Sequence, residues 1–166
     1  MADETIAVLE SIGGTSHLVG WSDGGNIGLI VAMRRPDLVK RLVVIGANFK
    51  YDAGLDIGLT DESPAMQMIA ENYMASSPDG PDHFEEFVTK SLVMWASEPN
   101  MTTQDLSKMS IPVLVMVGDD DGMNLSHTCE MYESIPGAQL SVIPGASHAV
   151  PMEKSAEVAR LVDEFF

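Results

Sequence analysis

Short apolar runs alternate with amphipathic stretches in the first part of the chain. Residues 3–12 place apolar side chains at helical spacing, and a Gly-Gly pair ends this predicted helix. SHLVGW (16–21) has the composition of a short buried strand, and residues 24–35 return to helical spacing until a proline follows. The run RLVVIGA (41–47) is β-branched and apolar on both faces, which is typical of a central parallel strand.

The pattern becomes irregular between residues 48 and 110, where Gly, Pro, Asp and Met are frequent. Within this insert the apolar spacing predicts helices over 64–76, 81–97 and 102–108. Several methionines lie there, and flexible core packing or a lid over a hydrophobic substrate are both compatible with them. Regular alternation then returns, with predicted strands at 111–118 and 139–143 and predicted helices at 126–134 and 153–166.

Strands that alternate with helices predict an α/β fold. We expect a parallel sheet of about four strands with helices on both faces. The length suits a single domain over residues 1–166, with residues 48–110 as a cap-like helical insert. In such sheets the chemistry lies beyond the carboxyl ends of the strands, so the residues that follow each strand are the candidates for a site.

Charge and cysteine content narrow the classes of partner. The 166 residues include 25 acidic and 9 basic side chains, for a net charge of −16. This disfavours nucleic acids and anionic membranes as partners and is compatible with a cationic substrate or simply a solvated acidic surface. Cys129 is the only cysteine, so neither an intrachain disulfide nor a cysteine-based metal site is expected. No signal-peptide or membrane-spanning pattern is present, and we expect a cytoplasmic protein.

The first strand ends in GWSDGG (20–25), which has the Gly-x-Ser-x-Gly pattern of a nucleophile elbow. We expect Ser22 on a strained turn between strand and helix, with Gly20 and Gly24 leaving room for backbone where a Cβ would clash. The backbone N–H of Asp23, at the start of the helix, is a natural donor to an oxyanion. The alternative for Ser22 is a small residue in a tight turn or a helix N-cap.

A serine nucleophile needs a base and an acid that orients the base. His148 follows the last strand, and three acids, Asp119, Asp120 and Asp121, follow the strand before it. The chain order Ser, Asp, His is the one expected of this elbow. A calcium loop at DDDG is disfavoured because alternating ligands and a distal Glu are absent. The other three histidines have no comparable context and are expected to be structural or exposed.

These segments together resemble the α/β-hydrolase superfamily. GWSDGG followed by VVIGAN is similar to its valacyclovir-hydrolase-like and meta-cleavage-product-hydrolase-like branch. PVLVMVGDDDG resembles the family's acid-bearing segment, and PGASHAVPMEKSAEVARLVDEFF its histidine loop and last helix. The resemblance implies a serine hydrolase of carboxylic esters without a cofactor or metal. It implies Ser22, His148 and Asp121 as the triad, with Asp119 as the second choice for the acid.

Two residues beside Ser22 have open roles. Asp23 is either a helix-terminal acid stabilised by the helix dipole or the group that binds the ammonium of an α-amino-acid ester, as the resemblance to GWSDGG hydrolases suggests. Trp21 is expected to pack under the elbow, and we count it with Asp23 among candidate substrate-binding residues.

The resemblance covers only the carboxyl-terminal part of a family member. Only 21 residues precede Ser22, and the His-Gly loop that supplies a second oxyanion donor in the family is not among them. Loss of one donor costs about 10²–10³ in rate, so residual activity is expected. Strand 16–21 becomes an unprotected edge, which predicts a homodimer or larger oligomer. The alternative function is a catalytically impaired partial fold that acts as an oligomeric binding or structural unit.

Overall fold

The computed structural model describes residues 1–53, 60 and 62–166, and its centre is a parallel sheet. Its four strands follow one another in the order β1-β2-β3-β4, and all three pairings are parallel. The strands are β1 (Ser16–Trp21), β2 (Val39–Ile45), β3 (Val113–Gly118) and β4 (Gln139–Ile143). The predicted α/β class with a four-stranded parallel sheet is therefore confirmed.

The helices also follow the predicted order. They are α1 (Ala2–Ile12), α2 (Asp23–Arg34), α3 (Pro64–Ser76), α4 (Phe84–Trp95), α5 (Thr103–Leu106), α6 (Leu125–Ser134), α7 (Val150–Glu153) and α8 (Ser155–Phe165), with short 3₁₀ turns η1 (Pro36–Leu38) and η2 (Pro81–His83). Two predicted helices are interrupted. The stretch 81–97 begins as the 3₁₀ turn and continues as α4, and the stretch 153–166 is preceded by α7, a single turn with Pro151 in its first positions.

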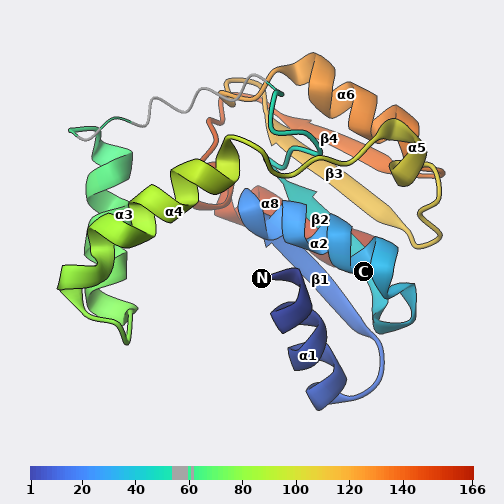
Figure 1. Ribbon diagram of the computed structural model, residues 1–166. Coiled ribbons are helices and arrows are strands. Elements are labelled where there is room, and N and C mark those ends of the chain that lie inside the picture. The colour runs from blue at the N-terminus through green and yellow to red at the C-terminus, as the bar shows by residue number, and fades with distance from the viewer. Residues whose placement is uncertain (54–59, 61) are drawn as a thin grey trace.

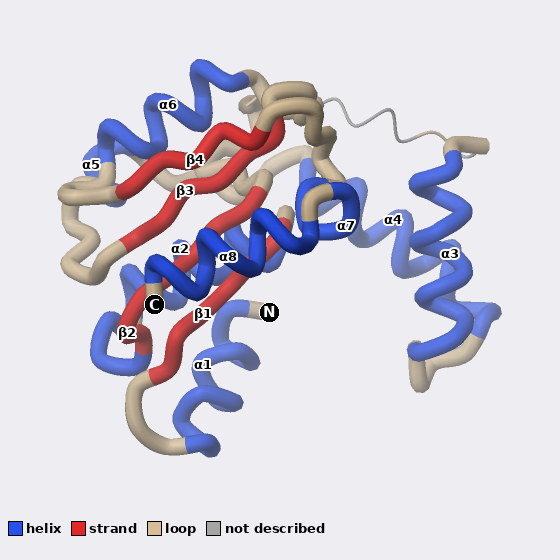
Figure 2. Tube along the Cα trace, turned by 180° about the vertical axis from the view of Figure 1, so that it is seen from behind, coloured by secondary structure: helices blue, strands red, loops and turns tan. Residues whose placement is uncertain are grey.

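Helices cover both faces of the sheet, because side chains alternate between the faces along each strand. Leu42 and Val44 of β2 point into a cluster shared with α1, α2, α5 and α6. Val43 and Ile45 point into a second cluster with α7 and α8. Figure 1 shows α2 on the near side of the sheet, and Figure 2, from behind, shows α8 crossing the opposite side.

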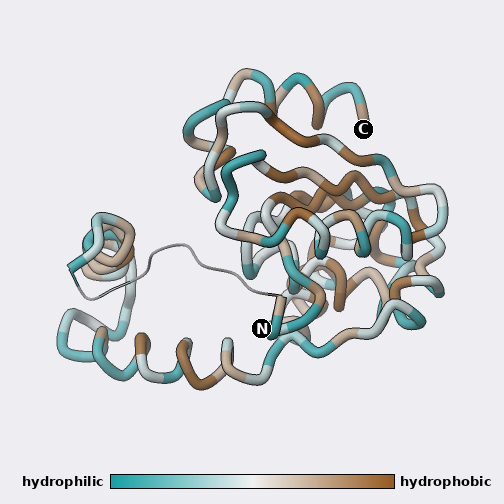
Figure 3. The backbone as a smooth tube through the Cα atoms, turned by 90° about the horizontal axis from the view of Figure 1, so that it is seen from above, coloured by the Kyte–Doolittle hydropathy of each residue, from teal (hydrophilic) through white to brown (hydrophobic). Residues whose placement is uncertain are grey.

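The predicted insert 48–110 has two parts of different character. Helices α3 and α4, which we call the helical arm (residues 64–95), contain no buried residue and extend away from the sheet in Figures 1 and 3. The end of the insert instead joins the core, where Met101, Leu106 and Met109 are buried. Residues 54–59 and 61 of the insert lie outside the described residues.

Strand β1 forms one edge of the sheet, and it is less covered than the two central strands, β2 and β3. Val19 is 51% exposed and Trp21 38% exposed, whereas every residue of β3 is buried. None of the helices in the described part of the chain is long and apolar enough to cross a membrane.

Candidate active site

Ser22 occupies the sharp turn between β1 and α2. Its φ is +54° and its ψ −124°, and it is the only non-glycine residue with positive φ in the described parts of the chain. The turn is held because the Ser22 N–H donates to the Ile45 carbonyl at 2.8 Å, and the Ser22 carbonyl accepts from the N–H groups of Gly25 and Asn26. Such strained backbone persists only where surrounding structure fixes it, and it is common at functional sites.

Two glycines allow this turn to approach the helix closely. They are not the pair expected from the motif. A Cβ on Gly20 would lie 2.3 Å from the Gly24 carbonyl oxygen, so Gly20 is required as predicted. A Cβ on Gly24 would meet nothing within 4 Å, so the expected clash at Gly24 is wrong. The second close approach falls on Gly25, where a Cβ would lie 2.7 Å from the Ala47 side chain.

Ser22, His148 and Asp121 form one chain of hydrogen-bonding contacts. His148 Nε2 lies 3.0 Å from Ser22 Oγ, and His148 Nδ1 lies 3.0 Å from Asp121 Oδ1. The Asp121 side chain is fully buried and that of His148 is 15% exposed. With Asp121 ionised, it can only accept, so Nδ1 carries the proton and Nε2 is free to accept from the serine hydroxyl. The structure therefore brings together the three side chains that the sequence singled out.

Asp119, the alternative acid, has a different partner. Its Oδ1 accepts from the backbone N–H of Gly145 at 2.6 Å and of Ala146 at 3.4 Å. Asp119 thus holds the loop that carries His148, and Asp121 is the acid that contacts the imidazole. The backbone of β3 also approaches this loop closely, since a Cβ on Gly118 would lie 2.0 Å from the Ala146 carbonyl oxygen.

Two further side chains hold the histidine loop. Both oxygens of Glu153 accept from Ser147, one from its N–H at 2.7 Å and one from its hydroxyl at 2.8 Å. These hydrogen bonds lower the pKa of the Glu153 carboxyl. Trp21 donates its indole N–H to the His148 carbonyl at 2.8 Å. His148 is therefore restrained through its ring and through its own and its neighbour's backbone.

The expected position of Trp21 under the elbow is wrong. Side chains alternate along β1, and Gly20 faces α2, so Trp21 points to the opposite face of the sheet. There it lies beside His148, with ring centroids 5.9 Å apart, and remains 38% exposed.

Gly46 follows β2 and makes room for the contact between His148 and Asp121. Its φ is +56°, and a Cβ there would lie 3.0 Å from Asp121 Oδ2 and 3.1 Å from His148 Nδ1. That Asp121 oxygen is buried and has no hydrogen-bond partner among the described residues. The position of this glycine in VVIGAN is therefore explained by the space that Asp121 and His148 need. In the sequence, only its place directly after a strand indicated a special role.

Asp23 starts α2 beside the proposed nucleophile. As the first helical residue, it has a backbone N–H without an acceptor inside the helix, so that donor is available to an oxyanion. Its carboxylate accepts from two neutral donors. Trp95 Nε1, at the end of α4, lies 2.7 Å from Oδ2, and Asn26 Nδ2 lies 3.3 Å from Oδ1.

Asn26 continues this network into the core. It exchanges two hydrogen bonds of 2.9 Å with Asn48, through its side-chain amide and through the Asn48 backbone N–H. The next residue, Phe49, donates its backbone N–H to His127 Nε2 at 3.2 Å and stacks on the His127 ring at 4.2 Å between centroids. Burial lowers the pKa of His127, which suits a neutral, structural imidazole as the sequence suggested.

No sequence motif indicated several of these supporting residues. Asn26, Asn48, Trp95 and Glu153 carry no local pattern that marks them, because their partners lie 22 to 72 residues away or depend on loop conformation. Among the described residues, no group of three or more His, Cys, Asp or Glu side chains has an arrangement that suits a metal ion.

Comparisons with known proteins agree with this geometry. A family model described as the alpha/beta hydrolase family matches residues 1–161. The chain is 27% identical to the serine hydrolase BPHL of Mus musculus over 161 residues, and 27% identical to a 2-hydroxymuconate semialdehyde hydrolase of Pseudomonas putida over 187 residues. Among solved structures, a meta-cleavage product hydrolase from Pseudomonas fluorescens superposes with a TM-score of 0.72 at 23% identity, which indicates the shared fold.

These matches cover most of this chain but a smaller share of each relative. The match to the mouse protein covers 89% of this chain but 53% of that protein, and the match to the Pseudomonas putida enzyme covers 98% and 66%. The structural match covers 99% of this chain and 70% of the Pseudomonas fluorescens enzyme. The chain thus spans roughly half to two thirds of the length of these curated relatives.

Proposed function

The chain belongs to the alpha/beta hydrolase family, and from this we propose that it is a serine hydrolase of carboxylic esters that works through an acyl-enzyme. The observation that supports it best is the pair of 3.0 Å contacts that link Ser22 Oγ to His148 and His148 to Asp121. The names of its relatives, which include a serine hydrolase, agree with a hydrolytic reaction.

In the proposed first half-reaction, Ser22 Oγ attacks the ester carbonyl carbon while His148 Nε2 takes the hydroxyl proton. Asp121 holds the imidazole in the tautomer that can accept and stabilises the imidazolium that forms. The carbonyl oxygen becomes an oxyanion, which accepts from the Asp23 N–H at the positive end of α2. When the tetrahedral intermediate collapses, the C–O bond to the alcohol breaks, and His148 returns the proton to the alcohol.

The second half-reaction repeats these roles with water. His148 removes a proton from a water molecule that attacks the acyl carbon, and the Ser22 oxygen leaves with that proton. The products are a carboxylic acid and an alcohol, and the enzyme is regenerated. The helix dipole and the Asp23 N–H stabilise the oxyanion in both halves.

For the acyl group we propose an α-amino acid. Within the described part of the chain, the Asp23 carboxylate accepts from two neutral donors, Trp95 and Asn26, and neither compensates its charge. Asp23 also lines a pocket of about 290 Å³ on the side of α2 that faces the start of α1. Its lining has two further acids, Asp3 and Glu98, and one base, Arg34, which pairs with Asp3. A carboxylate with free lone pairs next to the nucleophile suits a substrate ammonium group.

Fluorophosphonate labelling tests the proposed nucleophile, because the probe needs an activated serine but little substrate recognition. We expect intact mass to show one adduct on the 166-residue chain and none on Ser22→Ala. Asp121→Asn should slow labelling by about 10³–10⁴, since the imidazole would lose its orienting acceptor. Hydrolysis of p-nitrophenyl esters and of matched amino-acid esters then measures the acyl preference.

Two results would contradict these proposals. A folded chain that is not labelled would favour the alternative, a catalytically impaired fold that acts as a binding or structural unit. Equal kcat/KM for an alanine ester and the matched propionate ester would remove the amino-acid proposal while leaving the hydrolase in place.

We also propose that a second copy of the chain pairs with β1. The strand lies at the edge of the sheet, and Val19 and Trp21 present apolar surface there. A strand edge carries unpaired backbone groups, and two equal edges can satisfy each other around a twofold axis. Light scattering should give twice the mass of one chain, and Val19→Lys should halve it. A wild-type monomer at micromolar concentration would contradict the pairing.

A further inference from the structure

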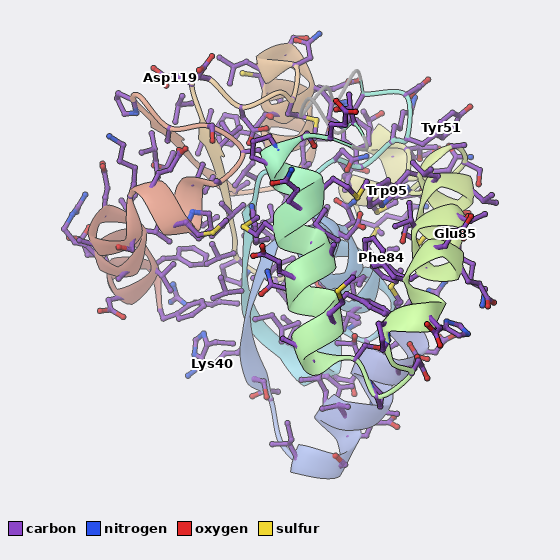
Figure 4. The ribbon with its side chains drawn as sticks, turned by 90° about the vertical axis from the view of Figure 1, so that its left-hand side faces the viewer. Lys40, Tyr51, Phe84, Glu85, Trp95 and Asp119 are labelled. Carbon is purple, nitrogen blue, oxygen red and sulfur yellow. The ribbon has the colours of Figure 1, made fainter. Side chains whose placement is uncertain are left out.

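Helix α4 reaches the turn of the proposed nucleophile through one side chain. Trp95, the last residue of α4, donates its indole N–H to Asp23 Oδ2 at 2.7 Å, and Asp23 directly follows Ser22. Figure 4 labels Trp95 at this end of α4 and Phe84 at the other. The acceptor is a carboxylate, so the bond is charge-assisted, and such bonds are about twice as strong as neutral ones.

The two partners of this bond are held with very different firmness. Asp23 belongs to α2, six of whose twelve residues are buried, and its carboxylate also contacts Asn26 in the buried Asn26–Asn48 network. Helix α4 contains no buried residue. If the bond is lost, we therefore expect α2 to keep its place and the end of α4 to move, within the limit set by Pro99 and Met101, which are buried a few residues further along the chain.

The segment around Trp95 also lines the pocket that contains Asp23. Met94 and Glu98, on either side of Trp95 in the chain, line the pocket of about 290 Å³ together with Asp23 and Ile27 of α2. One part of the lining thus comes from α2, a second from the end of α4 and the residues that follow it, and a third from the start of α1. The Trp95–Asp23 bond joins the first two parts.

We propose that Trp95 is a positioning residue that holds Met94 and Glu98, its neighbours in the chain, against α2 at the pocket lined by Asp23, beside the reacting serine. This rests on the proposed hydrolase function, in which Asp23 lies beside the reacting serine. Because the backbone of α2 is fixed by its own packing, the oxyanion donor keeps its position without Trp95. The bond therefore supports substrate binding, and its loss should raise KM and leave kcat nearly unchanged.

The hydrogen bond between Trp95 and Asp23 can be detected by NMR, without an assay of enzyme activity. The chain has two tryptophans, so its ¹H–¹⁵N spectrum should contain two indole N–H signals, assigned by Trp21→Phe and Trp95→Phe. Asp23→Asn replaces the charged acceptor by a neutral one. We expect it to move the Trp95 signal upfield and to leave the Trp21 signal, whose acceptor is the His148 carbonyl, in place. A Trp95 signal that does not move would overturn the proposal.

Kinetics then separate positioning from a general structural role. Trp95→Phe keeps an aromatic ring and removes the donor, and we expect KM for p-nitrophenyl butyrate to rise about tenfold, in line with loss of a hydrogen bond to a charged group. The rate of labelling by a small fluorophosphonate and kcat should stay within about twofold. Val93→Ala, on the same helix and 68% exposed in the parent chain, is the matched control and should change none of these.

Other outcomes are also decisive. An unchanged KM, or a fall in kcat without a rise in KM, would overturn the proposed role of Trp95. A wild-type chain that is neither labelled nor active would refute the hydrolase function, and the indole signals would still show whether Trp95 and Asp23 are bonded. If Trp95→Phe does not fold, Asp23→Asn breaks the charge-assisted bond from the other side, with the same expected rise in KM.

Discussion

The end of the sheet that carries Ser22, His148 and Asp121 and the helical arm that extends beside it are built in different ways. Around the three side chains, backbone approaches leave no space for a Cβ at Gly20 and Gly118, and a Cβ at Gly46 would lie about 3 Å from the side chains of Asp121 and His148. In the arm, α3 and α4 bury no residue, and Leu92 and Val93 are more than half exposed. The side chains that need accurate geometry for proton transfer thus lie where tight packing fixes their positions. The exposed surface of the arm lies outside this tightly packed region.

The largest expected effect of this difference is on stability. Leu29 of α2 is fully buried, and Leu92 of α4 is 54% exposed. Leu29→Ala leaves a cavity and should lower the free energy of unfolding by about 2–5 kcal/mol. Leu92→Ala should change it by no more than about 0.5 kcal/mol. Urea unfolding of both variants, followed by far-UV circular dichroism, compares the two regions with the same substitution, and similar losses would contradict the comparison.

The next prediction concerns accuracy within the site. Gly46→Ala puts a methyl group about 3 Å from Asp121 and His148 at a residue with a left-handed conformation, so the backbone is strained and these side chains must shift slightly from their contact. We expect fluorophosphonate labelling of Ser22 to slow by about 10²-fold or more, by analogy with other losses of histidine orientation. Gly137→Ala is the matched control, since Gly137 has a φ of +70° but nothing within 4 Å of its Cβ position. Equal labelling of both variants would show that Gly46 is needed only for its backbone conformation.

The strands, their order along the chain and their parallel direction could be predicted from the sequence, because the apolar runs of β2 and β3 and the turn residues that follow them are local signals. The positions of Ser22, Asp121 and His148 after β1, β3 and β4 are also local signals, and parallel topology alone brings them to the same end of the sheet. The roles of Gly24 and Trp21 were misjudged because each depends on what lies across the turn: open space for Gly24 and the opposite sheet face for Trp21.

Other features depend on partners that are remote in the sequence. The bond from Trp95 to Asp23 joins residues 72 positions apart, and neither spacing nor composition indicates it. Asn26 and Asn48 pair across 22 positions in the same way. A sequence pattern marks groups that react, but the side chains that hold those groups are chosen by contacts which exist only after folding.

A smaller effect is expected where an exposed side chain supports the histidine loop. Glu153→Ala removes both acceptors of Ser147, and we expect labelling of Ser22 to slow by about tenfold, as for loss of an outer hydrogen-bond partner. Glu157→Ala, at an exposed position in the first turn of α8, is the control and should leave labelling unchanged. Equal rates in the two variants would show that Ser147 does not need Glu153.

The same side chain predicts a pH dependence of stability. The pKa of Glu153 is lowered in the folded protein, so its stabilising contribution is complete above the ordinary glutamate pKa and is lost as pH falls through the lowered folded value. The urea midpoints of wild type and Glu153→Ala should therefore differ most at neutral pH and converge as the pH falls below the lowered folded pKa. A difference that stays constant over this range would mean that the ionised form of Glu153 contributes nothing.

The smallest expected effect is on hydrogen exchange, and it tests most directly whether the arm opens independently of the sheet. Ser63 caps α3, its hydroxyl accepting from the Met66 N–H at 3.2 Å, and Ser63→Ala removes that bond at a cost of about 1 kcal/mol. If the arm opens independently, amide hydrogen exchange in α3 should accelerate about fivefold while the amides of β2 and β3 keep their rates. Acceleration in all three elements by the same factor would mean that arm and sheet unfold as one unit. In that case Trp95 would act in a rigid body, and the rise in KM expected for Trp95→Phe would need a cause other than release of α4.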